Sequence, residues 1–367
     1  MAEGEGELIS TGAFRVDREK ALEKLSRYQT PDPSLFMLPW VRAAVAGGAT
    51  HIGMSLAKDG NFIMAFDGEP VRPDLADPSA CLFADAPDPR LKQLAVGILA
   101  ALRLNPHEVT LTSGRAGERR CLKLGGSDET LEAVESENEN TILWVLFLQD
   151  RLAEDWNRKV FEACRASPVP MRIGDSDLAP FDGKDAVGLM IREGGRRVWL
   201  EPAEPESASI QVFQHGVYVC DWKWPGGPLL PADGFIDDPA LELNASQTGV
   251  VADHRRKAAE AALLQAAGPL VAAVAGTQRE RLLRLRGRLS ERAWRKAWRI
   301  WVAGHNAYGW PEPWAKDKED LEESAIATRW LKRVAEGAMS ERLPPDARRT
   351  LSEAPLDVDD HGEPRVG

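Results

Sequence analysis

The sequence predicts an α+β fold, in which helices and strands alternate early in the chain and separate later. Two apolar runs, at residues 62–66 and 141–148, have the length and continuity of strands buried in a sheet. Residues 171–250 hold several further short strand-like runs, whereas the chain from residue 253 onward is helical in pattern. With 367 residues, the chain is long enough for two or three domains with separate cores.

The first ordered elements are two helices and a hairpin. A helix is predicted at residues 18–29, with Asp17 as its N-cap, and a second at residues 35–47, ending at a Gly-Gly pair. Strands at residues 51–57 and 61–66 follow, and the Asp-Gly pair between them is typical of a tight hairpin turn.

The next segment alternates polar and apolar stretches. Residues 69–89 are rich in Pro and Asp and are too polar to form core. A helix is predicted at residues 93–104, then strands at residues 108–112 and 119–124. The acidic residues 128–140 are expected to form a loop before the long apolar strand, which should lie in the middle of a sheet.

A helix at residues 155–165 is followed by Pro168-Val169-Pro170, which we interpret as a domain boundary. The segment beyond it is mostly strand-like, with predicted strands at residues 186–192, 197–201, 209–214 and 217–222.

The C-terminal third is predicted to be helical. A helix at residues 253–267 ends at a Gly-Pro break, and a second helix runs from there to residue 276. Two further helices are predicted at residues 277–304 and 320–336. The long helix carries many arginines, with Trp294, Trp298 and Trp301 on its apolar face. We expect these indoles to be buried and the arginines solvated, because Trp at helical spacing is usually core. The alternative is a surface that binds nucleic acid or another anionic partner.

Composition excludes several classes. A net charge of −11 argues against a general nucleic-acid binder, and no apolar run is long enough to span a membrane. The acidic N-terminus has no signal-peptide pattern, and the four cysteines are widely spaced, so we expect a cytoplasmic protein with reduced thiols. The six histidines show no metal-ligand spacing, so no metal site is expected.

Three short motifs suggest a nucleotide pocket. Asp67-Gly68 follows the apolar strand at residues 62–66, residues 92–101 read KQLAVGILAA, and Thr141 opens the long apolar strand. Together they resemble the GHKL ATPase superfamily, and in particular the N-terminal domain of the ninety-kilodalton heat-shock chaperones. The run keeps that family's Gln93, Val96 and Gly97 in register but lacks two of its glycines.

The resemblance implies a role for each motif. An aspartate at a strand end accepts a hydrogen bond from the adenine amino group, and Thr141 would support Asp67 in that role. Gly97 would open a helix and let backbone N–H groups approach phosphate oxygens. Residues 69–89 would form a short lid over ATP or ADP.

The second part of the chain resembles the middle domain of the same chaperones. Residues 211–219 look like a family hairpin, and residues 234–247 preserve the pattern Gly-x-x-Asp followed by Leu-x-Leu-Asn-x-Ser. The likeness covers about residues 14–258. It implies a GHKL sandwich at residues 14–167, which is the nucleotide-binding-like domain, and then a smaller α/β middle domain at residues 168–252. A helical region is expected at residues 253–343. Disordered tails are expected at residues 1–13 and 344–367.

The catalytic positions of the family are altered. The glutamate that activates water falls on Pro39, and the asparagine that holds Mg²⁺ falls on Ala43, one helical turn later. Neither side chain offers the oxygen that its role needs. The middle-domain arginine that reaches the γ-phosphate falls on Gln247, which carries no charge. Mg²⁺ binding is therefore doubtful.

The leading functional hypothesis is an ATP-binding protein related to these chaperones, with weak or absent hydrolysis, that acts on protein clients. The alternative is a pseudoenzyme scaffold that binds protein partners and no nucleotide. Nucleic-acid association through the arginine-rich helix is a weaker third hypothesis.

Overall fold

The computed structural model describes residues 32–57, 60–72, 88–125, 128–147, 152, 155–183, 188–203, 205–226, 230–274, Trp330 and the backbone of 355–358 and 364–366. The expected helix at residues 18–29, the interior of the expected lid and the arginine-rich helix with its three tryptophans lie outside the described residues.

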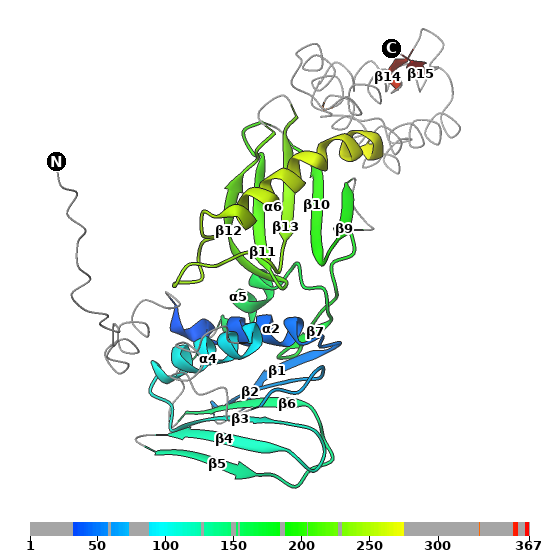
Figure 1. Ribbon diagram of the computed structural model, residues 1–367. Helices are drawn as coiled ribbons and strands as arrows, with labels where there is room; N and C mark the ends of the chain where they lie inside the picture. Colours follow the sequence, from blue (N-terminus) through cyan, green and yellow to red (C-terminus); the bar gives the residue numbers. More distant parts are fainter. Residues whose placement is uncertain are drawn as a thin grey trace, which may run out of the picture.

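An eight-stranded, mostly antiparallel sheet forms the base of the first part of the molecule, in the order β5-β4-β3-β6-β2-β1-β7-β8 (Figure 1). Only the β1–β7 pair is parallel among its described pairs. The strands are β1 (Ile52–Leu56), β2 (Phe62–Phe66), β3 (Glu108–Ser113), β4 (Arg120–Gly125), β5 (Asp128–Ala133), β6 (Thr141–Leu146), β7 (Met171–Ile173) and β8 (Ser176–Leu178).

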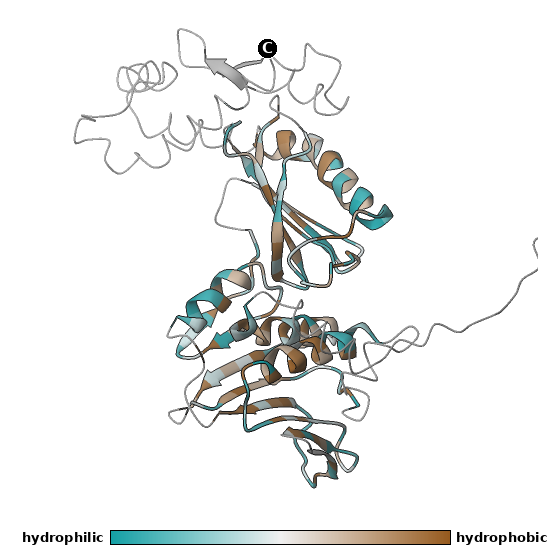
Figure 2. Ribbon diagram, turned by 90° about the vertical axis from the view of Figure 1, so that its left-hand side faces the viewer, coloured by the Kyte–Doolittle hydropathy of each residue, from teal (hydrophilic) through white to brown (hydrophobic). Residues whose placement is uncertain are grey.

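Two helices cover one face of this sheet, α2 (Met37–Ala46) and α4 (Pro89–Leu102), with η1 (Pro33–Leu35) and α5 (Trp156–Ala163) beside them (Figure 1). Their apolar faces and the inward side chains of β1, β2, β3 and β6 form one core. Hydrophobic residues are concentrated in the strands and in the helices that cover them (Figure 2). The expected helix at residues 93–104 begins earlier, because Asp88 caps it and Pro89 occupies its first turn.

The predicted central position of the long apolar strand is confirmed, since β6 lies between β3 and β2. The prediction of a loop at residues 128–140 was wrong for its first half, which is strand β5. β5 is an edge strand paired only with β4 in this sheet, and the charged side chains that suggested a loop are tolerated at such an edge. Residues 171–178, expected in the second domain, form β7 and β8 of the first sheet, because β7 pairs with β1.

A five-stranded sheet follows, in the order β12-β11-β13-β10-β9, with α6 (His254–Gln265) along one face (Figure 1). Its strands are β9 (Leu189–Glu193), β10 (Arg196–Pro202), β11 (Ser209–Gln214), β12 (Val217–Lys223) and β13 (Ala232–Asp237). The described chain is therefore an α+β protein, as predicted, and these are its two larger sheets. The central strand β13 was not predicted, because Gly234 interrupts its pattern.

Gly234 is required by its position in β13. Its φ is +149°, and a Cβ atom there would lie 2.0 Å from the carbonyl oxygen of Trp199 in β10. The second core includes Ala267, Leu270, Val271 and Val274 from the helical segment that follows α6. It also includes Trp330, whose indole donates to the Pro231 carbonyl at 2.6 Å.

Part of the C-terminal tail that was expected to be disordered forms a small antiparallel sheet, β14 (Pro355–Val358) with β15 (Pro364–Val366). The sequence between these strands is polar and contains Gly362, as is typical of a hairpin connection.

Candidate functional site

The Asp67 carboxylate ties the end of β2 to the loop between α2 and β1. Its Oδ1 accepts from the backbone N–H groups of Thr50 and His51, both at 2.8 Å, and its Oδ2 accepts from the Thr50 hydroxyl at 2.5 Å. Burial works to raise the pKa of Asp67, but these hydrogen bonds outweigh it and hold the pKa below its ordinary value. The expected adenine-reading carboxylate is thus anionic and already fixed in place.

Gly68 lets this turn press against the same loop. Its φ is +101°, and a Cβ atom would lie 2.8 Å from both the Gly47 oxygen and the Ala49 nitrogen. The next residue, Glu69, donates its backbone N–H to the Gly47 carbonyl at 2.9 Å. The Asp67-Gly68 pair is therefore required for local structure, whatever else it binds.

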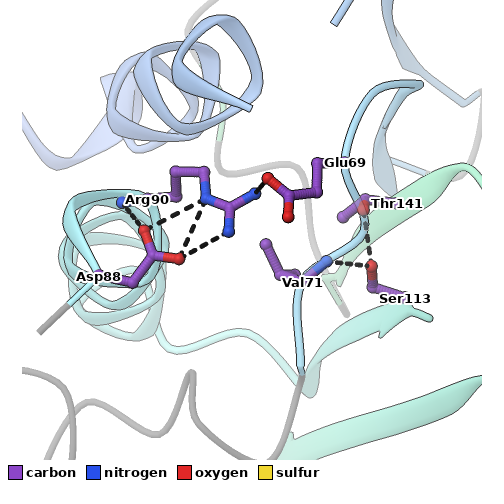
Figure 3. Close-up of polar contacts among 6 residues, drawn as sticks. All are labelled: Glu69, Val71, Asp88, Arg90, Ser113 and Thr141. Atoms are coloured by element: carbon purple, nitrogen blue, oxygen red, sulfur yellow. Dashed lines mark hydrogen bonds and ion pairs between the residues drawn. The ribbon is translucent and has the colours of Figure 1, made fainter. Parts of the chain in front are cut away.

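Thr141 lies beside the end of β2, since it pairs with Phe66. Its buried hydroxyl contacts the Ser113 hydroxyl at 2.7 Å, and the Ser113 oxygen accepts from the Val71 backbone at 3.0 Å (Figure 3). No contact between Thr141 and Asp67 is among the hydrogen bonds of the described residues. In this structure Thr141 supports the 69–72 segment through Ser113.

Arg90 contacts the 69–72 segment at Glu69, whereas Ser113 contacts it at Val71. Its guanidinium donates to Asp88 at 2.7 Å and to Glu69 at 2.8 Å (Figure 3). The hydrogen bond and charge of Arg90 hold the pKa of Asp88 below its ordinary value, despite partial burial. Because the Asp88 carboxylate also caps α4 by accepting from the Arg90 backbone, this helix N-terminus is occupied by a negative charge of its own.

Gly97 does not open a helix, which corrects the sequence-based expectation. It lies inside α4 and faces α2, where a Cβ atom would meet the Trp40 indole nitrogen at 2.2 Å and the Phe36 oxygen at 2.8 Å. The Trp40 indole also donates to the Leu94 carbonyl at 3.1 Å. Gly97 therefore provides close packing between two helices, and its surroundings are filled by an aromatic side chain.

Gln93 and Val96 lie on another side of α4, at a cavity of about 630 Å³ between this helix and the second part of the chain. Gln214, His215 and Gln247 line the opposite wall. This cavity is the place where the structure brings predicted pocket residues of both parts together. Asp67 and Thr141 do not line it.

The two positions of α2 that the resemblance aligns with catalytic residues are buried. Pro39 is buried and Ala43 is 3% exposed, both within the core below α4. Between them in sequence lies Arg42, also 3% exposed, which donates to the Gln247 side chain at 2.5 Å and to the Tyr218 carbonyl at 3.3 Å. Burial lowers the pKa of Arg42 to about 10, although Cys164 and Asp237 counteract the shift.

Gln247 is presented by a tight loop. Its backbone has a φ of +56°, and Asn244 fixes the turn by accepting from Ser246 and from the Thr248 backbone, both at 3.1 Å. The Leu-x-Leu-Asn-x-Ser pattern thus builds a loop that reaches α2, and the Arg42–Gln247 hydrogen bond joins the two parts of the chain.

Sequence reasoning missed three buried arginines, Arg42, Arg119 and Arg197. A signal existed for Arg42, because it stands alone among apolar residues of a buried helix, where a cation needs a specific partner. Arg119 follows a polar turn, and nothing in its pattern indicated burial.

Metal chemistry has no support in the described residues, where no group of three or more His, Cys, Asp or Glu side chains lies close enough to hold an ion. Within the same residues, no helix combines the length and the apolar character needed to cross a membrane.

Comparison with known proteins gives one kind of match. No family description and no curated protein matches the sequence. Among solved structures, the chain is similar to the B subunit of the DNA gyrase from Myxococcus xanthus, with 11% sequence identity and a TM-score of 0.47. The match covers 67% of this chain and 93% of that chain.

The structural role of Asp67 leads to a first prediction. Asp67→Asn is expected to destabilise the fold by about 1.5–3 kcal/mol, because a charged acceptor of three hydrogen bonds is lost. Since the pKa of Asp67 in the folded state lies below the ordinary value for an aspartate, this stabilisation is fully present above that ordinary value and is lost as pH falls through the folded-state pKa. Urea unfolding at neutral and acidic pH measures both effects, and equal stability of the two proteins at pH 7 would contradict this role.

Proposed function

We propose that this protein is a GHKL-type pseudoenzyme that does not hydrolyse ATP and works by binding protein partners. The single observation that carries the proposal is the state of the three catalytic positions. Pro39 and Ala43 are buried apolar residues, and Gln247 is engaged by Arg42. The general base, the metal ligand and the phosphate-binding cation of the ATPases are therefore all replaced by groups that serve packing or a domain junction.

The relation to the GHKL superfamily is supported by the arrangement as well as by the motifs. Two helices, α2 and α4, cover an antiparallel sheet, and Asp67 and Thr141 lie at adjacent strand ends. The 239–247 loop reaches back to α2, as a catalytic loop from a middle domain would. Chaperone-like binding of client proteins is part of the proposal and rests on the resemblance.

Phosphate release by the purified full chain tests the proposal. We expect no turnover above background with ATP and Mg²⁺, because loss of a general base alone costs about 10²–10⁴ in rate. Losses of the metal ligand and the cation act on the same reaction and will not simply multiply. Mg²⁺-dependent release that disappears in Asp67→Asn would overturn the proposal.

ATP binding without hydrolysis is the second candidate, and the Asp67 geometry favours it. A carboxylate offers about four lone-pair sites, and the three bonds described above leave one for an adenine amino group. A thermal-shift titration with ATP and ADP separates this candidate from a nucleotide-free scaffold. A shift that is absent in Asp67→Asn supports nucleotide binding, whereas no shift in the wild type supports the scaffold.

A further inference from the structure

A second cavity, of about 610 Å³, lies between the 69–72 segment and the turn that joins β3 to β4. This turn forms the wall opposite the 69–72 segment, and Ala133 of β5 lines the edge of the cavity. Glu69 and Val71, whose contacts are drawn in Figure 3, belong to the near wall. Its volume lies within the range of about 300–1,000 Å³ that is usual for sites of small organic molecules.

Arg119 is the unusual feature of this cavity. The residue is only 2% exposed, and its Nη2 donates to the Asn140 carbonyl. Its Nη1 is buried and has no hydrogen-bond partner, and no ion pair joins Arg119 to a carboxylate among the described residues. A buried guanidinium without an anion is costly, because desolvation of the charge is not repaid.

Glu118, the residue before Arg119, also lines this cavity, but among the described residues no ion pair joins Arg119 to Glu118 or to the other neighbouring acids. Glu69 is paired with Arg90 at 2.8 Å, and Glu139 accepts from the Ala116 backbone at 3.1 Å. Burial lowers the pKa of Arg119, while Glu139 acts in the opposite direction from a distance. Arg120 lies exposed on the cavity wall and adds positive charge.

We propose that this cavity binds a small organic molecule through an oxyanion, a carboxylate or a phosphate, that docks on the unpaired Nη1 of Arg119. A guanidinium presents its N–H groups in a planar fork, which matches the oxygens of either anion. Pro70, Val71 and Ala133 supply apolar surface for the remainder of the ligand. Asp67 does not line this cavity, so the site is separate from the adenine position discussed above.

Calorimetric titration of the full chain with sodium benzoate and with inorganic phosphate, at constant ionic strength, tests the proposal. Binding of benzoate indicates a carboxylate ligand, and binding of phosphate indicates a phosphorylated one. Arg119→Gln is expected to weaken the bound probe by about 10- to 150-fold, the equivalent of one charged hydrogen bond. Arg158→Gln, on the exposed surface of α5, is the matched control and should leave affinity unchanged.

Because Arg119 also holds Asn140, a second variant is needed that leaves this contact intact. Ala133→Phe changes an exposed edge-strand residue and places a ring at the cavity, so it should abolish binding without loss of the fold. The proposal is overturned if neither probe binds the wild type, or if Ala133→Phe binds a probe as tightly as the wild type does.

Discussion

Asp237→Ala is expected to destabilise the protein by about 3–5 kcal/mol, the usual cost of breaking a buried ion pair by removing one partner. Asp237 is 3% exposed and accepts from Arg197 at 2.5 Å and from the Gly216 backbone at 3.0 Å. The same arginine donates to the Ala166 carbonyl, which lies between α5 and β7 in the first part of the chain, so it joins the second sheet to the first part. Removing the carboxylate leaves a buried cation and a buried N–H without an acceptor at this junction.

Urea unfolding followed by tryptophan fluorescence measures the loss. Asp155→Ala is the matched control, because Asp155 forms only solvent-exposed ion pairs on α5 and its loss should change the stability little. Asp237→Asn keeps an acceptor and should fall between the two. A stability equal to that of Asp155→Ala would show that the Arg197–Asp237 pair contributes little to this junction.

Trp40→Ala is the second large effect, with an expected loss of about 3–5 kcal/mol for a fully buried aromatic side chain. The indole packs edge-on against Phe36 with ring centroids 5.0 Å apart, lies over Gly97, and donates to the Leu94 carbonyl. Trp40→Phe retains much of the burial and loses the hydrogen bond, so its cost should be smaller. Equal costs for the two variants would contradict a packing role for the indole.

The contact between Trp40 and Gly97 also predicts coupling. Gly97→Ala alone should destabilise by about 1–3 kcal/mol, because its methyl group has no space beside the indole. In the Trp40→Ala background that clash is removed, although the Phe36 oxygen remains close. The double variant should therefore be less destabilised than the sum of the single variants, and strict additivity would contradict direct contact.

The predictions for Trp40 and Gly97 concern the helices α2 and α4, where a nucleotide pocket was expected. In the described structure α2 and α4 are joined by Trp40, and α2 is joined to the 239–247 loop by Arg42. A ligand-driven rearrangement of this junction would have to replace both contacts. Of these contacts, the Arg42–Gln247 hydrogen bond is the one that joins the first part of the chain to the second.

The sequence by itself determined most of the elements. Apolar continuity predicted β2 and β6, although only alternate residues of each strand are fully buried and Trp144 in β6 is 40% exposed. The Asp-Gly pair placed the hairpin between β1 and β2, whereas the loop that carries Gln247 became visible only in the structure. Residue types alone also show that Pro39, Ala43 and Gln247 lack the carboxylate, the amide oxygen and the positive charge that the GHKL resemblance would require at these positions.

Only the tertiary structure decided what the residues of the GHKL-like motifs contact. Whether Gly97 meets a ligand or an indole depends on which helix lies against α4, and local sequence does not contain that information. Edge strand β5 and central strand β13 were missed because pairing with a neighbour overrode acidic residues in one and Gly234 in the other. The burial of Arg42 and Arg119 likewise arises from elements distant in sequence, which enclose a charge that its own segment would leave in water.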